Sequence, residues 1–487
     1  MKKLCALLLS LSLTITCFAL PAAAEGFPYQ FENGSPHCES ILMVNADTDT
    51  VVYSYNPDEK RAIASLTKIM TYIVAYENIP DIENQLITVP ESVEEDLEGT
   101  GSSLAYLQTG EQFTGLQLLN LMMVPSGNDA ALTLAKYVDS LGLTRPAGDI
   151  AADGTVGGDT ESEPGSTVDS AAGTDSAAEI PVTFVDLMNL KAQELGCKDT
   201  HFMNPHGLHE EEHYSTARDM IKIAEYARGL PHFAEITSQT VYEQPATNMN
   251  SENRYVYSTN RLLLQNQDPD YYYRYATGIK TGSLDESGYC LVSSAVLDGY
   301  TYLIAALGSP YIDANGDHIS EQGEMLDSRE LYRWAFTQLS LKTVAGSGQL
   351  MADTQLNYAW RKNRIQLVAG KDISVILPKD VETSSLITAL DIPESIDAPV
   401  KKGDVVGTAT LSYADEVVAT VPLVAAESVE RSEVMLTLQQ GKAVFTSPWF
   451  LVLAGGIVLL ILIYILLMIL HNRSKKRQKN VRRYRDM

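Results

Sequence analysis

The chain has 487 residues, which is enough for about three domains, and its 45% apolar and 8% aromatic content excludes global disorder. The net charge of −26 is unevenly spread, because residues 1–24 carry +2 and residues 471–487 carry +7, which leaves −35 on residues 25–470. A body this acidic would be repelled by phosphate backbones. We therefore expect no nucleic-acid partner.

The first 24 residues have the pattern of a secretory signal peptide. Lys2 and Lys3 precede an apolar stretch over residues 4–20, and the small residues Ala22-Ala-Ala24 follow it. Cys17 could instead indicate a lipoprotein signal, but the Thr-Ile-Thr before it lacks the small residues expected before a lipidated cysteine. We expect cleavage after Ala24.

The other end of the chain has the pattern of a membrane anchor. Trp449–Leu470 is an uncharged apolar run of 22 residues, long enough to cross roughly 30 Å of hydrocarbon. Eight Lys and Arg residues follow within 471–487, and such a basic flank is typical of the cytoplasmic side. We expect a linker at 427–447, one transmembrane helix at 448–470 and a cytoplasmic tail at 471–487, with the acidic body outside the cell membrane.

Two folded parts are expected between these ends. Residues 25–343 mix helical and strand patterns, which predicts an α/β (α+β) domain with a sheet flanked by helices. Within it, residues 146–181 are low in complexity, acidic and free of Lys, Arg and aromatic residues, so we expect a disordered insertion. Residues 344–426 alternate short strands with Gly, Pro, Asp and Lys turns, which predicts a small all-β domain.

Individual elements of the first domain can be placed from periodicity. A hairpin is expected over 39–55, and the Asp298-Gly299 pair predicts a second hairpin between the strands at 288–296 and 300–307. Helical spacing predicts helices that start at or near residues 65, 116, 183 and 217.

Three short motifs carry reactive side chains. Ser65-Leu-Thr-Lys68 places a hydroxyl and an amine on successive turns of one predicted helix face. Ser126-Gly-Asn128 follows an apolar helix, and Lys280-Thr-Gly282 lies on the first strand of the late meander. Each triplet alone is weak, because a helix cap, a polar loop or an edge-strand lysine would look the same, but all three in this order form a specific pattern.

With these motifs the sequence resembles the low-molecular-mass penicillin-binding proteins of the serine-type D-alanyl-D-alanine carboxypeptidase family. The resemblance covers nearly all of 38–425 apart from the insertion. Further matching segments are Pro125–Ala130, Asn204–Leu208, Ser215–Asp219, Gly278–Gly282, Gly288–Ala295, Lys401–Gly407 and Ala419–Val424. The resemblance implies a penicillin-binding/β-lactamase-like transpeptidase fold and a role in peptidoglycan biosynthesis and cell shape. It also implies stem peptides ending in D-Ala-D-Ala as the substrate and β-lactams as covalent inhibitors.

The residue chemistry suggests roles for these positions. Ser65 would be the nucleophile and Lys68 its base, provided that burial and a second cation, Lys280, keep the Lys68 amine neutral. Ser126 would relay the proton to the leaving amine, and Asn128 would orient Lys68 and the substrate. Lys280 and Thr281 would bind the terminal carboxylate, with Gly282 and Ser283 also at the substrate. The resemblance adds the backbone N–H of Ser283 to that of Ser65 as oxyanion donors.

Alternatives remain at this stage. A class A β-lactamase shares Ser-x-x-Lys and Lys-Thr-Gly, although Gly127 stands where that enzyme usually has Asp and no convincing Glu-x-x-x-Asn loop precedes Lys280. A non-catalytic penicillin sensor or wall-binding scaffold would have no need of Lys68 or Asn128. An endopeptidase acting on cross-links would use the same chemistry.

No metal or cofactor is expected. His209-Glu-Glu-Glu-His213 matches the zinc-protease motif H-E-x-x-H, but it follows Pro205-His-Gly and is nearly devoid of apolar residues, so a solvated loop is the better interpretation. Ser215 and Thr216 would cap the helix that follows. We expect His206 to support this loop, Arg261 to form a surface ion pair or assist carboxylate binding, and Cys38, Cys197 and Cys290 to be small buried side chains.

Overall fold

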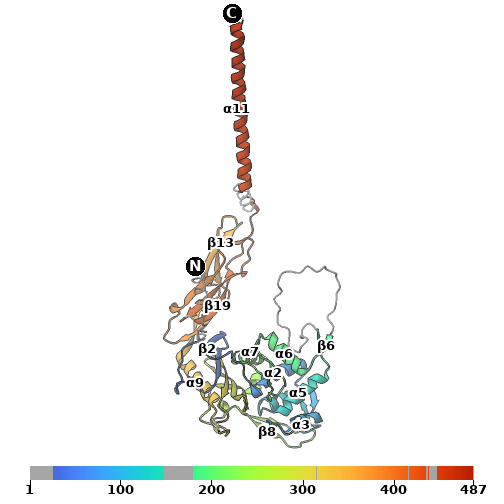
Figure 1. Cartoon of the computed structure of the whole chain (residues 1–487). Helices are drawn as coiled ribbons and strands as arrows, with labels where there is room; N and C mark the ends of the chain where they lie inside the picture. The colour runs from blue at the N-terminus through green and yellow to red at the C-terminus, as the bar shows by residue number, and fades with distance from the viewer. Residues whose placement is uncertain are drawn as a thin grey trace, which may run out of the picture. The chain divides into compact units, whose positions relative to one another are not determined.

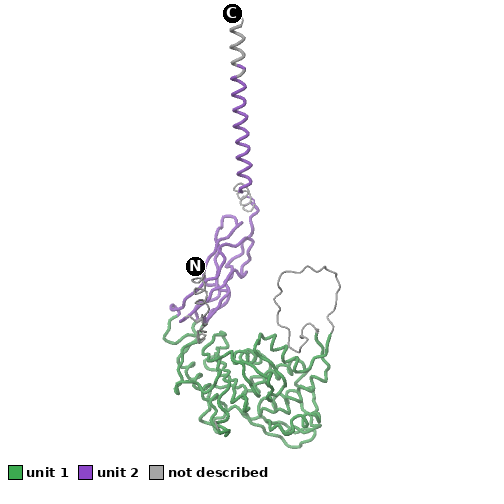
Figure 2. The backbone as a smooth tube through the Cα atoms, viewed as in Figure 1, with its two compact units in different colours: residues 1–342, 375–382 green, residues 343–374, 383–487 purple. Residues whose placement is uncertain are grey.

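A computed structural model describes residues 26–146, 179–313, 315–414, 416–434, 437 and 447–485. The predicted signal peptide lies outside these residues, as do most of the predicted insertion and most of the predicted linker. The chain forms two compact units, which Figure 2 shows in green and purple. The first comprises the chain up to Lys342 together with Val375–Glu382, and the second comprises Thr343–Ser374 and the chain from Thr383 onward.

The first unit is built on a five-stranded antiparallel sheet of order β2-β1-β11-β10-β9. These strands are β1 (Ser40–Asn45), β2 (Thr50–Tyr55), β9 (Ala276–Leu284), β10 (Gly288–Leu297) and β11 (Tyr300–Ser309). Both predicted hairpins are confirmed by the pairing of β1 with β2 and of β10 with β11. Asp298 and Gly299 both have positive φ, as the two-residue turn between β10 and β11 requires.

Helices cover both faces of this sheet. All six residues of β1 are buried, and a strand without alternating exposure must be covered on both sides. On one face, Leu303 of β11 joins the core that contains Ile223 of α7 (Ala217–Arg228). On the other, Tyr302 packs against Phe336 of α9 (Gly323–Gln338), with ring centroids 4.9 Å apart.

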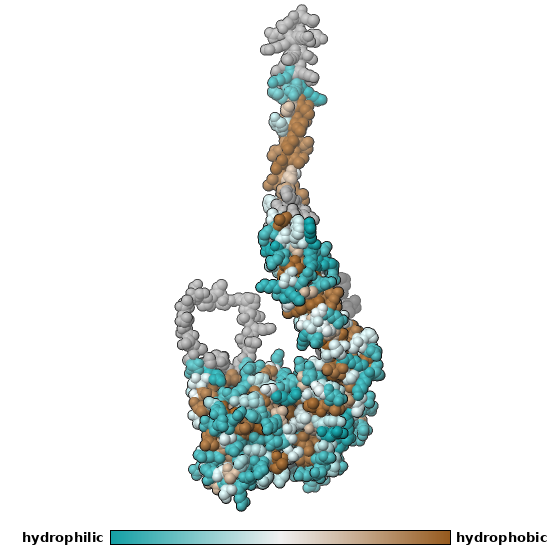
Figure 3. Space-filling model, turned by 180° about the vertical axis from the view of Figure 1, so that it is seen from behind, coloured by the Kyte–Doolittle hydropathy of each residue, from teal (hydrophilic) through white to brown (hydrophobic). Residues whose placement is uncertain are grey.

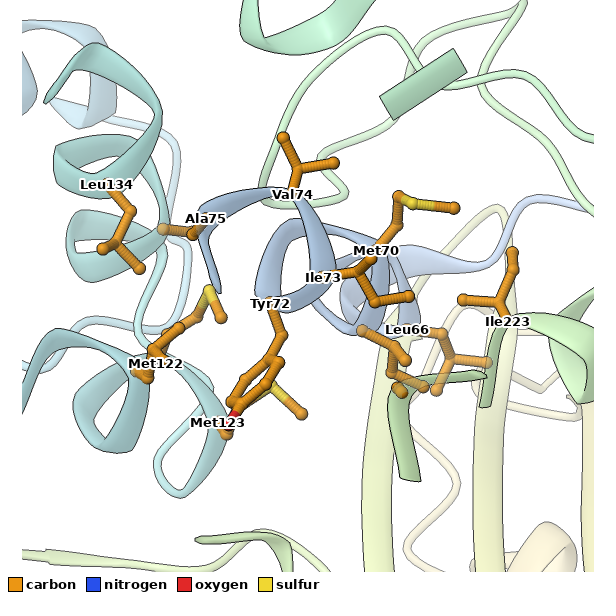
Figure 4. Packing of buried hydrophobic residues seen from close by; sticks show 14 of the residues in the cluster. Leu66, Met70, Tyr72, Ile73, Val74, Ala75, Met122, Met123, Leu134 and Ile223 are labelled. Carbon is orange, nitrogen blue, oxygen red and sulfur yellow. The ribbon is translucent and has the colours of Figure 1, made fainter. Parts of the chain in front are cut away.

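The helix α2 (Lys68–Asn78) lies in the middle of the main core. Its residues from Lys68 to Ala75 are all buried. Figure 4 shows Tyr72, Ile73 and their neighbours on α2 packed against side chains of α4, α5 and α7. The surrounding helices are α3 (Glu91–Leu97), α4 (Gly115–Met123), α5 (Asn128–Ser140), α6 (Phe184–Glu194) and α8 (Phe233–Thr237).

The ends of the predicted insertion are more ordered than its composition suggested. Strand β5 (Thr144–Pro146) pairs with β6 (Glu179–Pro181), so Pro146 and the last three residues of 146–181 form a short ladder. Two further small ladders join β3 (Leu86–Thr88) to β4 (Gln112–Thr114) and β7 (Val241–Gln244) to β8 (Arg254–Tyr257).

The second unit contains a six-stranded sheet of order β16-β18-β19-β14-β13-β17. Its strands are β13 (Leu350–Asn357), β14 (Arg364–Ala369), β16 (Ile387–Asp391), β17 (Ser395–Asp397), β18 (Val405–Tyr413) and β19 (Glu416–Ala425), and all pairs are antiparallel except β13 with β17. Strands β12 (Leu339–Ala345) and β15 (Ile373–Pro378) form a separate pair. Leu356, Ile365, Leu367 and Leu423 belong to the core of the six-stranded sheet.

A single long helix, α11 (Pro448–Arg485), follows (Figure 1). Its segment Pro448–Arg473 has a mean hydropathy of 3.1 in the most apolar window, and none of that window is buried. Figure 3 shows this apolar surface as the brown part of α11. By length and composition this helix can cross a membrane.

Candidate active site

Ser65 lies in a tight turn of 3₁₀ helix, η1 (Ala64–Thr67), which leads directly into α2. The predicted helical start near Ser65 is confirmed, but its first turn is 3₁₀ rather than α-helical, because α2 begins at Lys68. Ala64 has a φ of 46°, a conformation that costs energy for a residue with a side chain and is enriched at functional positions. Leu66 is fully buried and fixes the turn to the core.

The amine of Lys68 is enclosed by three acceptors. Its Nζ donates to Ser65 Oγ at 2.8 Å, to Asn128 Oδ1 at 2.6 Å and to the backbone carbonyl of His206 at 2.8 Å. Lys68 has no solvent-exposed surface, although it stands at the first position of α2. Lys68 and Asn128, two predicted partners of Ser65, therefore form one hydrogen-bonded chain with it.

Burial lowers the pKa of Lys68 well below its usual value, and the positive charge of Lys280 lowers this pKa further. The carboxylate of Asp129 acts in the opposite direction. Burial also lowers the pKa of Lys280, to about 7. Both lysines can therefore be neutral at a pH where an exposed lysine is charged.

Ser126 and Asn128 come from the connection between α4 and α5. Ser126 is 4% exposed and has a φ of 66°, a second backbone outlier beside Ala64. Asn128 is the first residue of α5, and the neighbouring Asp129 accepts the N–H groups of Ala105 and Leu107. Among the residues that the structure describes, Lys68 makes no hydrogen bond to the Ser126 hydroxyl.

The Lys280-Thr-Gly282 motif on β9 packs against the turn that contains Ser65. A Cβ atom at Gly282 would lie 2.8 Å from the carbonyl oxygen of Ile63 and 3.1 Å from the Ser65 nitrogen, so glycine permits this close approach. Thr281 shares a 2.5 Å hydroxyl–hydroxyl hydrogen bond with Thr259. Lys280 points inward, is 1% exposed and donates to the Thr281 carbonyl at 3.0 Å.

A cavity of about 360 Å³ opens at this place. It is lined by Ser65 and Asn128 from the first two motifs and by Ser283, which directly follows the third. The other lining residues are Thr100, Gly101, Ser102, Ser103, His206, Gly207, Leu208, Leu284, Asp285, Glu286, Tyr311 and His318. Lys68 and Lys280 lie behind this surface. The arrangement presents a hydroxyl to the cavity and holds its amine partner away from solvent.

The segment with the H-E-x-x-H pattern forms no helix, so its two histidines cannot act as zinc ligands one helical turn apart. The structure also departs from a fully solvated loop. His213 is 3% exposed, its Nε2 lies 2.8 Å from Thr67 Oγ1, and burial lowers its pKa to about 4. Among the described residues, no group of three His, Cys, Asp or Glu could hold a metal.

Other residues singled out by the sequence have structural partners. The His206 ring accepts the Leu208 N–H at 3.2 Å, so it supports its loop as expected, and burial lowers its pKa to about 3. Arg261 forms an ion pair with Asp268 at 2.6 Å, and its guanidinium carbon lies 4.5 Å from the Tyr271 ring centroid. The three predicted buried cysteines are buried and unbridged. Thr216 caps α7.

Three contributions escaped the sequence analysis. The His206 carbonyl contacts Lys68, but a backbone acceptor leaves no mark on residue type. Thr259 reaches Thr281 from the segment after β8, about twenty residues away, and a lone threonine gives no signal. Asp129 could have been suspected, because it directly follows the Ser126-Gly-Asn128 motif.

Sequence comparisons agree with this geometry. Residues 30–140 and 170–310, more than half of the chain, match the D-alanyl-D-alanine carboxypeptidase family, peptidase S11. Residues 340–431 match the family described as penicillin-binding protein 5, C-terminal domain.

Curated relatives match over most of their length. The D-alanyl-D-alanine carboxypeptidase DacF of Bacillus subtilis (strain 168) is 27% identical over 435 residues, covering 89% of this chain and 96% of the relative. DacA of Escherichia coli (strain K12), with the same activity in its name, is 26% identical over 435 residues, covering 85% of this chain and 91% of the relative.

The fold is shared with solved structures. Penicillin-binding protein 5 from Haemophilus influenzae superimposes with a TM-score of 0.61 at 23% identity, covering 83% of this chain and 99% of that protein. The predicted fold class, a mixed catalytic domain followed by an all-β domain and an apolar C-terminal helix, is confirmed.

Proposed function

Because this chain belongs to the D-alanyl-D-alanine carboxypeptidase family (peptidase S11), we propose that it removes the terminal D-alanine from peptidoglycan stem peptides through an acyl-enzyme on Ser65. One observation carries the assignment of these residues. The Ser65 hydroxyl faces a cavity and lies 2.8 Å from a wholly buried amine. A serine becomes a useful nucleophile only when such a base takes its proton.

In the first step, neutral Lys68 accepts the proton of Ser65, and Ser65 Oγ attacks the carbonyl carbon of the penultimate D-alanine. Asn128 and the His206 carbonyl hold the amine in place, so its free lone pair is directed at Ser65. The carbonyl oxygen becomes an oxyanion, which the N–H groups of Ser65 and Ser283 would stabilise. The two segments that bear these groups are brought together where Gly282 packs against Ser65.

The tetrahedral intermediate then collapses. The C–N bond breaks, and the leaving nitrogen of D-alanine takes a proton that passes from Lys68 through Ser126. In the second half of the reaction, water attacks the ester carbonyl, its proton returns to Ser65 Oγ through Lys68, and the shortened peptide leaves.

The terminal carboxylate of the substrate would bind at the hydroxyl of Thr281, and the negative charge of this carboxylate would favour the charged form of the buried Lys280. Arg261 is held by Asp268 and Tyr271, which favours the ion-pair interpretation of this residue over carboxylate binding. A requirement for a free carboxylate distinguishes a carboxypeptidase from an endopeptidase.

For the location, we propose that α11 crosses the cell membrane once, with the first unit and the six-stranded sheet of the second unit outside and the basic tail inside. Its apolar segment and the eight Lys and Arg residues at its end support this topology. β-Lactams, whose strained amide resembles the scissile bond, are expected to acylate Ser65.

Intact-mass spectrometry on the full chain in detergent micelles tests this function. A lasting benzylpenicillin adduct on Ser65, absent from Ser65→Ala, together with release of D-alanine from an acyl-D-Ala-D-Ala peptide, is the expected result. Rapid loss of the adduct with consumption of the drug would indicate a β-lactamase. An adduct without D-alanine release would indicate a penicillin sensor, and a folded protein with no adduct would refute the serine mechanism.

A further inference from the structure

The loop between β13 and β14 presents an exposed tryptophan. Trp360 is 57% exposed, and the Arg361 guanidinium carbon lies 5.9 Å from its ring centroid. The neighbouring Ala359 is 3% exposed and belongs to the core of the sheet, so the loop is fixed at its base. Trp360 is therefore held outward on an anchored loop, and exposure of so large an apolar side chain calls for an explanation.

This loop, defined as Tyr358–Asn363 and called the Trp360 loop, lies beside the segment that leads to α11. The Ser432 N–H donates to the Tyr358 carbonyl at 2.7 Å, and Lys362 forms an ion pair with Glu427. Fifteen positions separate Ser432 from Ser447, which directly precedes α11. Such a length of chain reaches at most about 50 Å, so the base of the loop lies within about 50 Å of the start of α11.

The chemistry of the Trp360 loop suits a lipid headgroup region. Residues 25–470 carry a charge of −35, yet the loop and its border contribute Arg361, Lys362 and Arg364. Lys362 and Arg364 are paired with Glu427 and Asp353, whereas Arg361 forms no ion pair among the described residues and lies near the Trp360 ring. Tryptophan with an adjacent arginine is the combination typical of the membrane–water interface.

A protein partner fits these observations less well. Hydrophobic interfaces between proteins are usually built on several exposed apolar side chains around an anchor. Beside Trp360, the loop positions 361–363 are Arg, Lys and Asn, which are polar.

We propose that the Trp360 loop docks on the outer surface of the bilayer that α11 spans, with the Trp360 ring at headgroup level and Arg361 on lipid phosphate. The inference rests on the proposed topology, which places the six-stranded sheet outside the membrane. Docking would give this sheet a second attachment besides its link to α11 and so restrict how it can turn on the membrane surface.

Tryptophan fluorescence of the full chain in nanodiscs tests the docking. The chain has three tryptophans, Trp334, Trp360 and Trp449, so Trp334→Phe with Trp449→Phe leaves Trp360 as the sole reporter. With lipids brominated near the headgroup and a phosphatidylglycerol-rich bilayer, we expect a blue-shifted emission and a loss of emission relative to unbrominated lipid. Arg361→Glu should reduce this loss in both lipids, and more in phosphatidylglycerol than in phosphatidylcholine, because both carry a phosphate but only phosphatidylglycerol has a net negative charge.

A matched control places the reporter at the other end of the same sheet. Val417 is 58% exposed and stands near the start of β19, eight residues before the position that pairs with Leu367. In a chain without native tryptophan, Val417→Trp should keep its emission with brominated lipid. Equal quenching at both positions would overturn a docking specific to the Trp360 loop.

The remaining outcomes separate the docking from the topology. A chain with only Trp449 reports whether α11 is inserted. Quenching of Trp449 but not of Trp360 would overturn the docking and keep the topology, and quenching of neither would overturn both. A blue shift of Trp360 without bromolipid quenching would mean that a protein surface covers it. D-alanine release from a soluble peptide should be unchanged in Trp360→Ser, because Trp360 lies in the other unit from Ser65.

Discussion

The helices α2 and α11 are both dominated by apolar side chains, but their surroundings differ completely. From Lys68 to Ala75 every side chain of α2 is buried in protein. The most apolar window of α11 has no buried side chain, and its cations are confined to the last part of the helix. An apolar helix is thus enclosed by protein in one unit and left for lipid in the other.

This difference in surroundings determines the charge state of the basic side chains on each helix. At the end of α11 an Arg or Lys side chain remains in water and stays charged. On α2, Lys68 is surrounded by protein, so its charged form loses hydration and its pKa falls. The reactivity proposed for Lys68 is thus a consequence of its enclosure, and the predictions below test that link.

The largest effect is expected for Lys68→Arg. A guanidinium is permanently charged, so it cannot take the proton of Ser65, even if it fits the enclosed position. The rate of acylation by benzylpenicillin should fall by about 10²–10⁴-fold, as for loss of a general base. Stopped-flow or quenched-flow mass spectrometry measures this rate.

Lys136→Arg is the matched control. Lys136 lies on α5, where it forms an ion pair with Asp96, and its side chain is 29% exposed. Its acylation rate should remain near that of the unmodified chain. A Lys68→Arg protein that acylates normally would exclude Lys68 as the base, and thermal denaturation shows whether an inactive variant is still folded.

The second prediction compares one truncation in each helix. Ile73→Ala removes a fully buried side chain from α2 and should lower the free energy of unfolding of the first unit by roughly 2–5 kcal/mol. Leu460→Ala, at a residue of α11 that is 67% exposed, should change it by less than about 0.5 kcal/mol. Denaturation of each variant in nanodiscs, followed by loss of penicillin labelling, gives both values. Similar losses would mean that α11 packs on the first unit.

Periodicity predicted most of this fold because its elements obey simple local rules. The Asp298-Gly299 pair specifies the turn between β10 and β11, and the apolar run of 449–470 specifies a long helix. The strand pairing of Thr144–Pro146 with Glu179–Pro181 could not be predicted, since it joins two short segments across a long stretch of chain.

The candidate site was predictable at the level of motifs but not of geometry. Ser65, Lys68 and Asn128 carry distinctive side chains at recognisable spacing. The 3₁₀ turn before α2 and the buried position of His213 depend on tertiary contacts, such as the bond from His213 to Thr67. The sequence shows that His213 belongs to an H-E-x-x-H pattern, but it does not show that this side chain is buried against the turn that carries Ser65.

The third prediction concerns a buried carboxyl group, one oxygen of which has no hydrogen-bond partner among the described residues. Glu324 is 1% exposed, and among the described residues its Oε2 has no hydrogen-bond partner. Burial, assisted by the negative charge of Asp327, raises its pKa to about 8. Because the unfolded chain releases this proton near the usual pKa of Glu, the folded state loses stability as the pH rises from about 4.5 to about 8.

Glu324→Gln should remove this loss. The drop in unfolding free energy between pH 5 and pH 8 should shrink by roughly 3–4 kcal/mol in the variant, measured by chemical denaturation. Glu95→Gln, at an exposed position of α3, should leave the drop unchanged. An unchanged drop in Glu324→Gln would show that enclosure alone does not hold the proton.

The smallest effect separates enclosure from charge at Lys68. The rate of acylation should fall as the pH drops through the pKa of Lys68, because the protonated amine cannot act as a base. Below about pH 7 Lys280 is charged and lowers the pKa of Lys68, while Asp129 raises it. Lys280→Met should therefore move this acid limb to higher pH, and Asp129→Asn should move it to lower pH, each by up to about one pH unit.

Opposite shifts are the decisive feature, because each variant also affects other contacts. Lys280 lies on the strand that would bind substrate, and Asp129 holds two backbone N–H groups, so either change can alter the rate at every pH. A variant that changes the acylation rate equally at every pH leaves the midpoint of the acid limb in place. A variant that changes the pKa of Lys68 moves this midpoint. Midpoints that move together, or that both stay fixed, would mean that burial in α2, rather than its charged neighbours, sets the proton affinity of Lys68.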